Sequence, residues 1–184
     1  SNLKLSGGDL SGMTSTNGNG GVILINKNTC LKMKQVELAS GKAVYGGAAF
    51  CVDTLGVKID INDCRFVGNS SLNNAGALYL KAVAGKIANC IFENNTSERN
   101  GSALVSNKHA EISNSTFKNN FSTTSVSTDY GAAVFNTGGG YMEITNCTFD
   151  SNLTTQYGTG GFACSGPTTN SIMNNVTYWN NSGK

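Results

Sequence analysis

The sequence has little charge: Asp, Glu, Lys and Arg make up 13% of 184 positions, about half of what is usual in a soluble globular domain. The net charge of +2 is spread thinly, which argues against the clustered Lys and Arg that neutralise nucleic-acid phosphates. No apolar run approaches the roughly 20 residues that a membrane span needs. Proline occurs once, and no segment has the 3.6-residue periodicity of a long helix. These absences exclude a helical bundle.

Small polar residues replace the missing charge, with 25 Asn, 23 Gly, 19 Ser and 18 Thr. The length suits one domain with a sizeable core. A chain so poor in charged groups has few candidates for acid–base chemistry, and this composition favours a scaffold over an enzyme.

A six-residue pattern, aliphatic-x-Asn/Asp-x-x-aromatic, recurs along the chain. Its clear copies lie at 61–66, 87–92, 112–117, 144–149 and 173–178. We expect two weaker copies upstream, with Met33 before Leu38 and Leu5 before Leu10. Neighbouring copies are 25 to 32 residues apart, so seven copies occupy the whole chain. This repeat predicts one solenoid over residues 1–184, without a second domain.

The repeat unit is a β-coil, because short β-prone runs alternate with Asn and Gly. The sequence therefore predicts an all-β fold, a parallel β-helix whose coils stack at roughly 4.8 Å. The chain begins in the middle of a repeat and ends just after Asn181, without the polar caps of a complete solenoid. We expect it to be part of a longer repeat protein.

Equivalent side chains of successive coils are expected to form ladders. The aromatic ladder consists of Phe66, Phe92, Phe117, Phe149 and Tyr178. An Asn follows each of these aromatic residues by three positions, at Asn69, Asn95, Asn120, Asn152 and Asn181. A second column lies inside the six-residue pattern, at Asp63, Asn89, Asn114, Asn146 and Asn175. Both columns are expected at corners, where Asn tolerates left-handed backbone and bonds adjacent coils.

A Gly-rich element alternates with this pattern, as in Gly46-Gly47-Ala48-Ala49-Phe50 followed by Phe66-x-x-Asn69. The pair recurs through Gly131 and Phe149-x-x-Asn152. It resembles the GGA[ILV]/FxxN repeats of chlamydial polymorphic membrane proteins and of adhesin-like surface proteins with right-handed parallel β-helix passengers. The resemblance implies a right-handed β-helix, of about six to seven coils here, with surface display and adhesion.

These expectations describe a non-catalytic structural or adhesive shaft segment, extracellular or on a cell surface, without a cofactor. Its expected partners are a host or neighbouring-cell surface protein or glycan, and flanking β-helix coils of the same chain. One alternative is a carbohydrate-active enzyme or polysaccharide-binding module on a pectate-lyase-like β-helix. Another is an extracellular filament subunit that associates end to end.

Six cysteines suggest a disulfide framework, but the ladder register points elsewhere. Cys64, Cys90 and Cys147 share one column, and of these only Cys64 and Cys90 lie in adjacent coils. We interpret the cysteines as small buried hydrophobic residues, with a Cys64–Cys90 disulfide as the alternative. The chain has no CxxC motif and one His, which argues against a zinc site.

Ten Asn-x-Ser/Thr triplets occur. In most of them the repeat itself places Ser or Thr after a ladder Asn, which cannot carry a glycan if it points inward. Asn94, Asn100 and Asn180 fall outside the ladders and are the candidate acceptors in a eukaryotic secretory pathway.

Candidates for chemistry are few. Asp60, Glu111 and Glu143 share an outward column that Lys86 interrupts, and adjacent coils would hold Glu111 and Glu143 roughly 5 Å apart, as in a retaining glycosidase. This pair is the enzymatic candidate; two solvated carboxylates are the alternative. The only histidine, His109, is expected in a solvated turn.

Tyrosines precede several of the Gly-rich elements. Tyr45, Tyr130 and Tyr157 are expected near one corner, where aromatic rings could stack on sugars. Packing over the neighbouring loop is the alternative.

Overall fold

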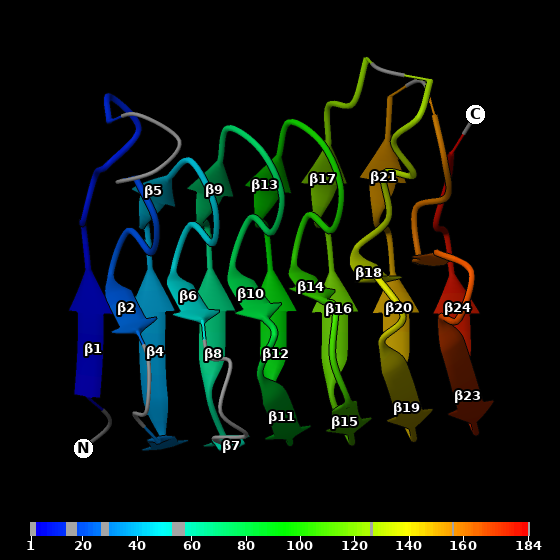
Figure 1. Ribbon diagram of the computed structural model, residues 1–184, viewed down its shortest axis with the longest axis horizontal. Coiled ribbons are helices and arrows are strands. Elements are labelled where there is room, and N and C mark those ends of the chain that lie inside the picture. Colours follow the sequence, from blue (N-terminus) through cyan, green and yellow to red (C-terminus); the bar gives the residue numbers. More distant parts are fainter. Residues whose placement is uncertain are drawn as a thin grey trace.

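The computed structural model describes residues 3–13, 18–26, 30–52, 58–125, 127–155 and 157–183. These residues form β-strands, turns and loops, and no helix is present among them. The strands build four parallel sheets that run side by side from the N-terminal to the C-terminal end (Figure 1). The predicted all-β parallel solenoid is confirmed.

The successive strands of the chain join the four sheets in turn. Sheet I contains β1 (Leu3–Ser6), β4 (Val36–Ala39), β8 (Arg65–Val67), β12 (Ile91–Glu93), β16 (Thr116–Lys118), β20 (Thr148–Asp150) and β24 (Thr177–Trp179). Sheet II contains β2 (Ile23–Asn26), β6 (Ala49–Val52), β10 (Leu78–Lys81), β14 (Leu104–Ser106), β18 (Val134–Thr137) and β22 (Phe162–Ser165). Sheet III contains β3 (Leu31–Lys34), β7 (Lys58–Asn62), β11 (Ala84–Ala88), β15 (Ala110–Ser113), β19 (Tyr141–Thr145) and β23 (Asn170–Asn174). Sheet IV contains β5 (Lys42–Ala43), β9 (Ser70–Ser71), β13 (Thr96–Ser97), β17 (Phe121–Ser122) and β21 (Leu153–Thr154).

Left-handed residues make the corner between sheets III and I. The expected column has positive φ throughout, at Asp63, Asn89, Asn114, Asn146 and Asn175. Their side chains also bond along the axis, as between Asn146 Nδ2 and Asn114 Oδ1 at 3.2 Å. This part of the corner prediction is confirmed.

The corner between sheets I and IV differs from the prediction. Positive φ falls one residue before the buried Asn, for example at Gly68 and Asn94 instead of Asn69 and Asn95. The physical reason is that the left-handed residue turns the chain at this corner, so the Asn after it points into the core. Asn69, Asn95, Asn120 and Asn152 are fully buried.

These buried side chains form a continuous hydrogen-bonded ladder. The Nδ2 of Asn95 donates to Asn120 Oδ1 at 2.9 Å and to the carbonyl oxygen of Phe66 at 2.9 Å. The backbone N–H of Asn95 donates to the same Oδ1 at 3.1 Å. The pattern repeats from Asn69 to Asn181. Each ladder Asn from Asn69 to Asn152 thus joins its coil to both neighbouring coils, and Asn181 joins the last coil to the one before it.

Aromatic rings stack parallel to this ladder. Ring centroids of neighbouring residues lie 4.5 to 4.9 Å apart along the series Phe66, Phe92, Phe117, Phe149 and Tyr178. The four Phe rings are fully buried. An aliphatic ladder on sheet III pairs Met33, Ile61, Ile87, Ile112, Ile144 and Met173 in register. The expected core columns are confirmed.

One expected register is wrong. Leu5, not Leu10, pairs with Leu38, because the chain after β1 leaves the sheet at Gly7, a glycine with positive φ. Leu10 instead donates its N–H to the carbonyl oxygen of Lys42, beside sheet IV.

Candidate binding hollow on sheet III

The outer face of sheet III carries charged side chains from several successive strands. Side chains alternate along its strands, so Ile59 and Ile61 are buried while Lys58 and Asp60 are exposed. Strand register then arranges the outward residues in two rows along the solenoid axis. The upper row contains Cys30, Lys58, Ala84, His109 and Tyr141, and the lower row Lys32, Asp60, Lys86, Glu111 and Glu143.

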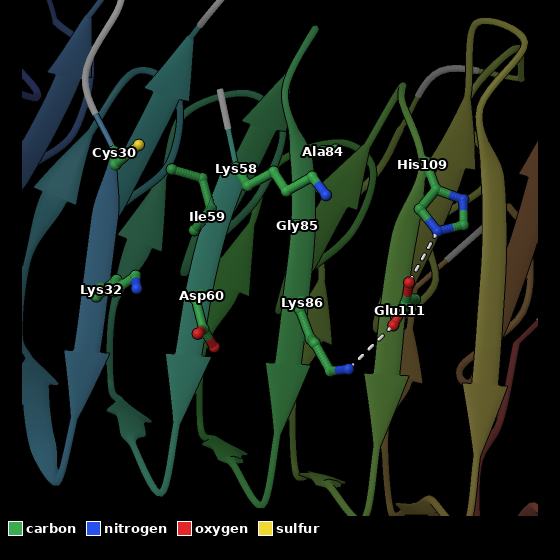
Figure 2. Close-up of a pocket in the computed structure, with 10 residues that line it drawn as sticks. All are labelled: Cys30, Lys32, Lys58, Ile59, Asp60, Ala84, Gly85, Lys86, His109 and Glu111. Atoms are coloured by element: carbon green, nitrogen blue, oxygen red, sulfur yellow. Dashed lines mark hydrogen bonds and ion pairs between the residues drawn. The ribbon is translucent and has the colours of Figure 1, made fainter. Parts of the chain in front are cut away.

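A hollow of about 400 Å³ lies over these rows (Figure 2). Its floor is low because Ala84 offers a methyl group between two long neighbours in its row, Lys58 and His109. Beneath it, the inward position of β11 is Gly85, where a Cβ would lie 2.5 Å from Leu80 Cδ1. The glycine therefore lets Leu80 fill the core directly under the hollow.

One wall of the hollow is held by Glu111. Its carboxylate pairs with Lys86 Nζ at 3.4 Å and with His109 Nε2 at 3.2 Å, as the dashed lines of Figure 2 show. The bond to His109, followed by the charge of Lys86, lowers the pKa of Glu111 below its ordinary value. The His109 ring also stacks on Tyr141, with centroids 5.3 Å apart. These contacts therefore hold the Glu111 and His109 side chains in position without a ligand.

The opposite side of the hollow carries charges without partners. Among the described residues, no carboxylate lies within ion-pair distance of Lys32 or Lys58, and no cation lies within that distance of Asp60. The Lys58 side chain extends over β11, next to Ala84 (Figure 2).

The predicted carboxylate pair is adjacent, since Glu111 and Glu143 are register partners on β15 and β19. The two are nevertheless engaged separately. Glu143 Oε1 accepts a hydrogen bond from Tyr141 Oη at 2.9 Å, which raises the pKa of Tyr141. His109 lies directly before β15, after the bend at residues 107–108, and its side chain is 43% exposed, which agrees with the expected solvated position. Sequence inspection missed its role, because its ring partner Tyr141 comes from the next coil.

The three candidate tyrosines occupy different surroundings. Tyr45 lies against Phe50 and Tyr79 on the outer side of sheet II, with centroids 6.4 and 6.0 Å away. Tyr130 stacks on Phe135 at 5.7 Å and is 42% exposed. Tyr157 is 38% exposed. For Tyr45 and Tyr130 the geometry favours the packing alternative.

The candidate glycan acceptors also differ. Asn94 and Asn180 are exposed. Asn100 is buried, and its Nδ2 donates to Asn74 Oδ1 and to Asp129 Oδ1, both at 3.3 Å. Asn100 lies outside the two predicted ladders, but its burial argues against it as a glycan acceptor. Its side chain instead helps to hold the buried Asp129, which lies between β17 and β18.

All six cysteines are free thiols in the structure. Cys51, Cys64, Cys90 and Cys147 are buried, while Cys30 and Cys164 are exposed. The Cys64 thiol donates to the carbonyl oxygen of Asn62, and the Cys90 thiol donates to the carbonyl oxygen of Ala88, both at 3.1 Å.

The described residues contain no cluster of His, Cys, Asp and Glu side chains that could hold a metal ion. They also contain no helix with the length and apolar character required to span a membrane.

Comparison with known proteins finds no matching family model, no match among the curated proteins and no match among the solved structures.

Proposed function

We propose that this chain is a non-catalytic, rigid shaft segment of an extracellular or cell-surface repeat protein, with a structural and adhesive role. The buried Asn ladder carries the proposal. Because each ladder Asn from Asn69 to Asn152 bonds both neighbouring coils, bending the coils apart would leave buried polar groups unpaired, at about 1–3 kcal/mol each. Such a shaft keeps its outer side chains at fixed spacing and can present them to a partner.

The finer features of the proposal rest on the repeat pattern. The resemblance to polymorphic membrane protein repeats supports a right-handed winding, about six to seven coils, surface display and attachment to a host or neighbouring-cell protein or glycan. The exposed Asn94 and Asn180 triplets are compatible with a secreted glycoprotein.

Coil stacking supports a second kind of partner. β24 is the last strand of sheet I, and its Tyr178 and Trp179 are 46% and 64% exposed. A strand edge of this kind pairs readily with another strand. We propose that it receives a further coil, from the same chain or end to end from a second copy. A molar mass that rises with protein concentration would identify the second case.

The test of the main proposal is incubation with a panel of acidic and neutral polysaccharides. New reducing ends and unsaturated products report catalysis, and retained protein reports binding. If the chain is a shaft, every polysaccharide stays intact, whether or not the protein is retained on it. Cleavage of any member of the panel would overturn the non-catalytic role.

A carbohydrate-active enzyme is the second candidate, and the adjacency of Glu111 and Glu143 is the observation in its favour. The pKa of Glu111 is lowered, whereas a general acid in glycoside hydrolysis needs a raised pKa. An enzyme built on this pair would therefore use Glu111 as the nucleophile and Glu143 as the acid. If cleavage is seen, Glu111→Gln and Glu143→Gln should each abolish it, while Glu98→Gln, at an exposed site outside sheet III, should not.

A further inference from the structure

We propose that the hollow on sheet III binds a carboxylate-bearing sugar residue of an acidic polysaccharide. This inference deepens the adhesive role proposed above, on which it rests, by naming the ligand class and the residues that contact it.

The cations of the hollow supply the attraction. Lys32 and Lys58 have no ion-pair partner among the described residues. Lys86 is paired with Glu111, but both side chains are about half exposed or more, and such surface pairs are worth roughly 0–1 kcal/mol. A ligand carboxylate can therefore recruit Lys86 at little cost. The three lysines come from neighbouring strands, β3, β7 and β11.

The shape of the hollow fits one sugar unit of a polymer. Its volume of about 400 Å³ lies at the lower end of the range for small-molecule sites. It is open to solvent and spans β3, β7, β11 and β15. A chain lying along the solenoid axis can therefore place one residue over Ala84 and continue in both directions.

Asp60 distinguishes a sugar from a simple polyanion. Its carboxylate lies between Lys32 and Lys86 in the lower row, and it would repel a phosphate chain or an acidic peptide. A sugar hydroxyl can instead donate a hydrogen bond to it. The His109 ring lines the far side of the hollow, and its stack on Tyr141, which lies outside the hollow, holds it in place. The lysines are cations that can bind a carboxylate, and Asp60 is an anion that can accept hydrogen bonds from hydroxyls. A uronate carries both of these groups.

The experiment is titration of the chain with a defined oligogalacturonate, followed by calorimetry and by NMR. The methyl ester of the same oligomer keeps the hydroxyls but loses the charge, and an oligo-aspartate keeps the charge but loses the hydroxyls. We expect the oligogalacturonate to bind more tightly than either of these probes. Equal binding of the oligo-aspartate would overturn the sugar assignment, and no binding of the oligogalacturonate would overturn the inference.

Matched variants locate the site. Ala84→Leu fills the hollow without a change of charge, and should weaken binding; Ala88→Leu, on the same face of β11 but outside the hollow, should not. Lys58→Gln should raise the Kd about two- to fivefold, as expected for the loss of one exposed ion pair. Lys118→Gln, on β16 of sheet I, makes the same charge change elsewhere and should leave the Kd unchanged. Equal effects within either pair would overturn the location.

Glu111→Gln tests whether removal of a negative charge strengthens binding. It removes a negative charge and frees Lys86, so it should tighten binding, about two- to fivefold. Weaker binding would contradict the role given to Lys86. Cleavage of the bound oligomer would overturn the non-catalytic shaft but leave the binding site standing, so the two proposals fail separately.

Discussion

The rings of Phe66 and Phe92 are stacked with centroids 4.5 Å apart and an interplanar angle of 1°. This spacing is close to the separation of neighbouring parallel strands, and Phe66 and Phe92 are register partners on β8 and β12. The aromatic ladder therefore repeats the geometry of the sheet that carries it, and each ring covers the next.

Removal of one ring from this stack should be costly. Phe92 is fully buried between Phe66 and Phe117, so Phe92→Ala should reduce the free energy of unfolding by about 3–5 kcal/mol. Ile91→Ala, at a neighbouring position that is 38% exposed, is the control and should cost far less. Urea unfolding of the three proteins measures both effects. Equal midpoints for wild type and Phe92→Ala would refute the core register.

The Asn ladder should be equally sensitive, although it is polar. Asn120→Ala removes the acceptor of the Asn95 N–H and Nδ2 groups and the donor to the Phe92 carbonyl oxygen. Buried polar groups left unpaired cost about 1–3 kcal/mol each, so a loss of several kcal/mol is expected in urea unfolding. Asn119→Gly is the control, because Asn119 is exposed with a φ of 52° that glycine adopts easily.

The sequence predicted the fold because each ladder leaves a periodic trace. Phe66-x-x-Asn69 and its copies identify the strand, the buried ring and the corner together. The pattern did not reveal which corner residue turns the chain, because Asn94 and Asn95 are the same residue type in different backbone conformations.

The candidate site was less predictable. Glu111 and Glu143 could be placed in one column by counting, since both lie on regular strands. The hollow depends on small residues, Ala84 and Gly85, beside long ones, and it has no sequence signature. The stack of His109 on Tyr141 has no sequence signature either, because its two rings lie 32 positions apart, at the upper end of the repeat spacing.

Acid should weaken the first coils through Glu37. A hydrogen bond from Lys4, together with the charges of Lys4 and Arg65, lowers the pKa of Glu37 from its ordinary value of 4.5. A lowered pKa in the folded state stabilises the fold above pH 4.5, and this contribution is lost as the pH falls through the folded pKa. The pairs are partly exposed, so the effect should stay below about 1 kcal/mol. Glu37→Gln should be less stable than wild type at pH 7, and the gap should narrow as the pH falls below 4.5; a constant gap would contradict this assignment.

Glycan occupancy should follow burial. In protein secreted from a eukaryotic host, Asn94 and Asn180 are exposed and should carry glycans, whereas the buried Asn95, Asn100 and Asn120 should not. Peptide mass spectrometry of the folded, secreted fraction measures each triplet separately. A glycan on Asn120 in that fraction would contradict the buried ladder, because its Nδ2 already donates to the Phe92 carbonyl oxygen and to Asn152 Oδ1.

Two of the six thiols should react fast with a thiol reagent, and the other four should react slowly. Cys30 and Cys164 are exposed, whereas the other four are buried, and burial raises the pKa of Cys51 to about 12. The neighbouring Cys90 side chain lowers the pKa of Cys64, while the neighbouring Cys64 side chain and burial raise the pKa of Cys90. A low pKa favours the reactive thiolate, but Cys64 is only 1% exposed, so access should limit its reaction. A colorimetric thiol titration should count two rapid equivalents in native protein.

Denaturation then separates free thiols from a Cys64–Cys90 disulfide. Full unfolding under non-reducing conditions should raise the count to six if all the cysteines are free. A count of four would identify the disulfide, and Cys64→Ser should then restore one free thiol, that of Cys90. The native count tests burial independently, since more than two rapid equivalents would mean that the coils around Cys64 and Cys147 open readily.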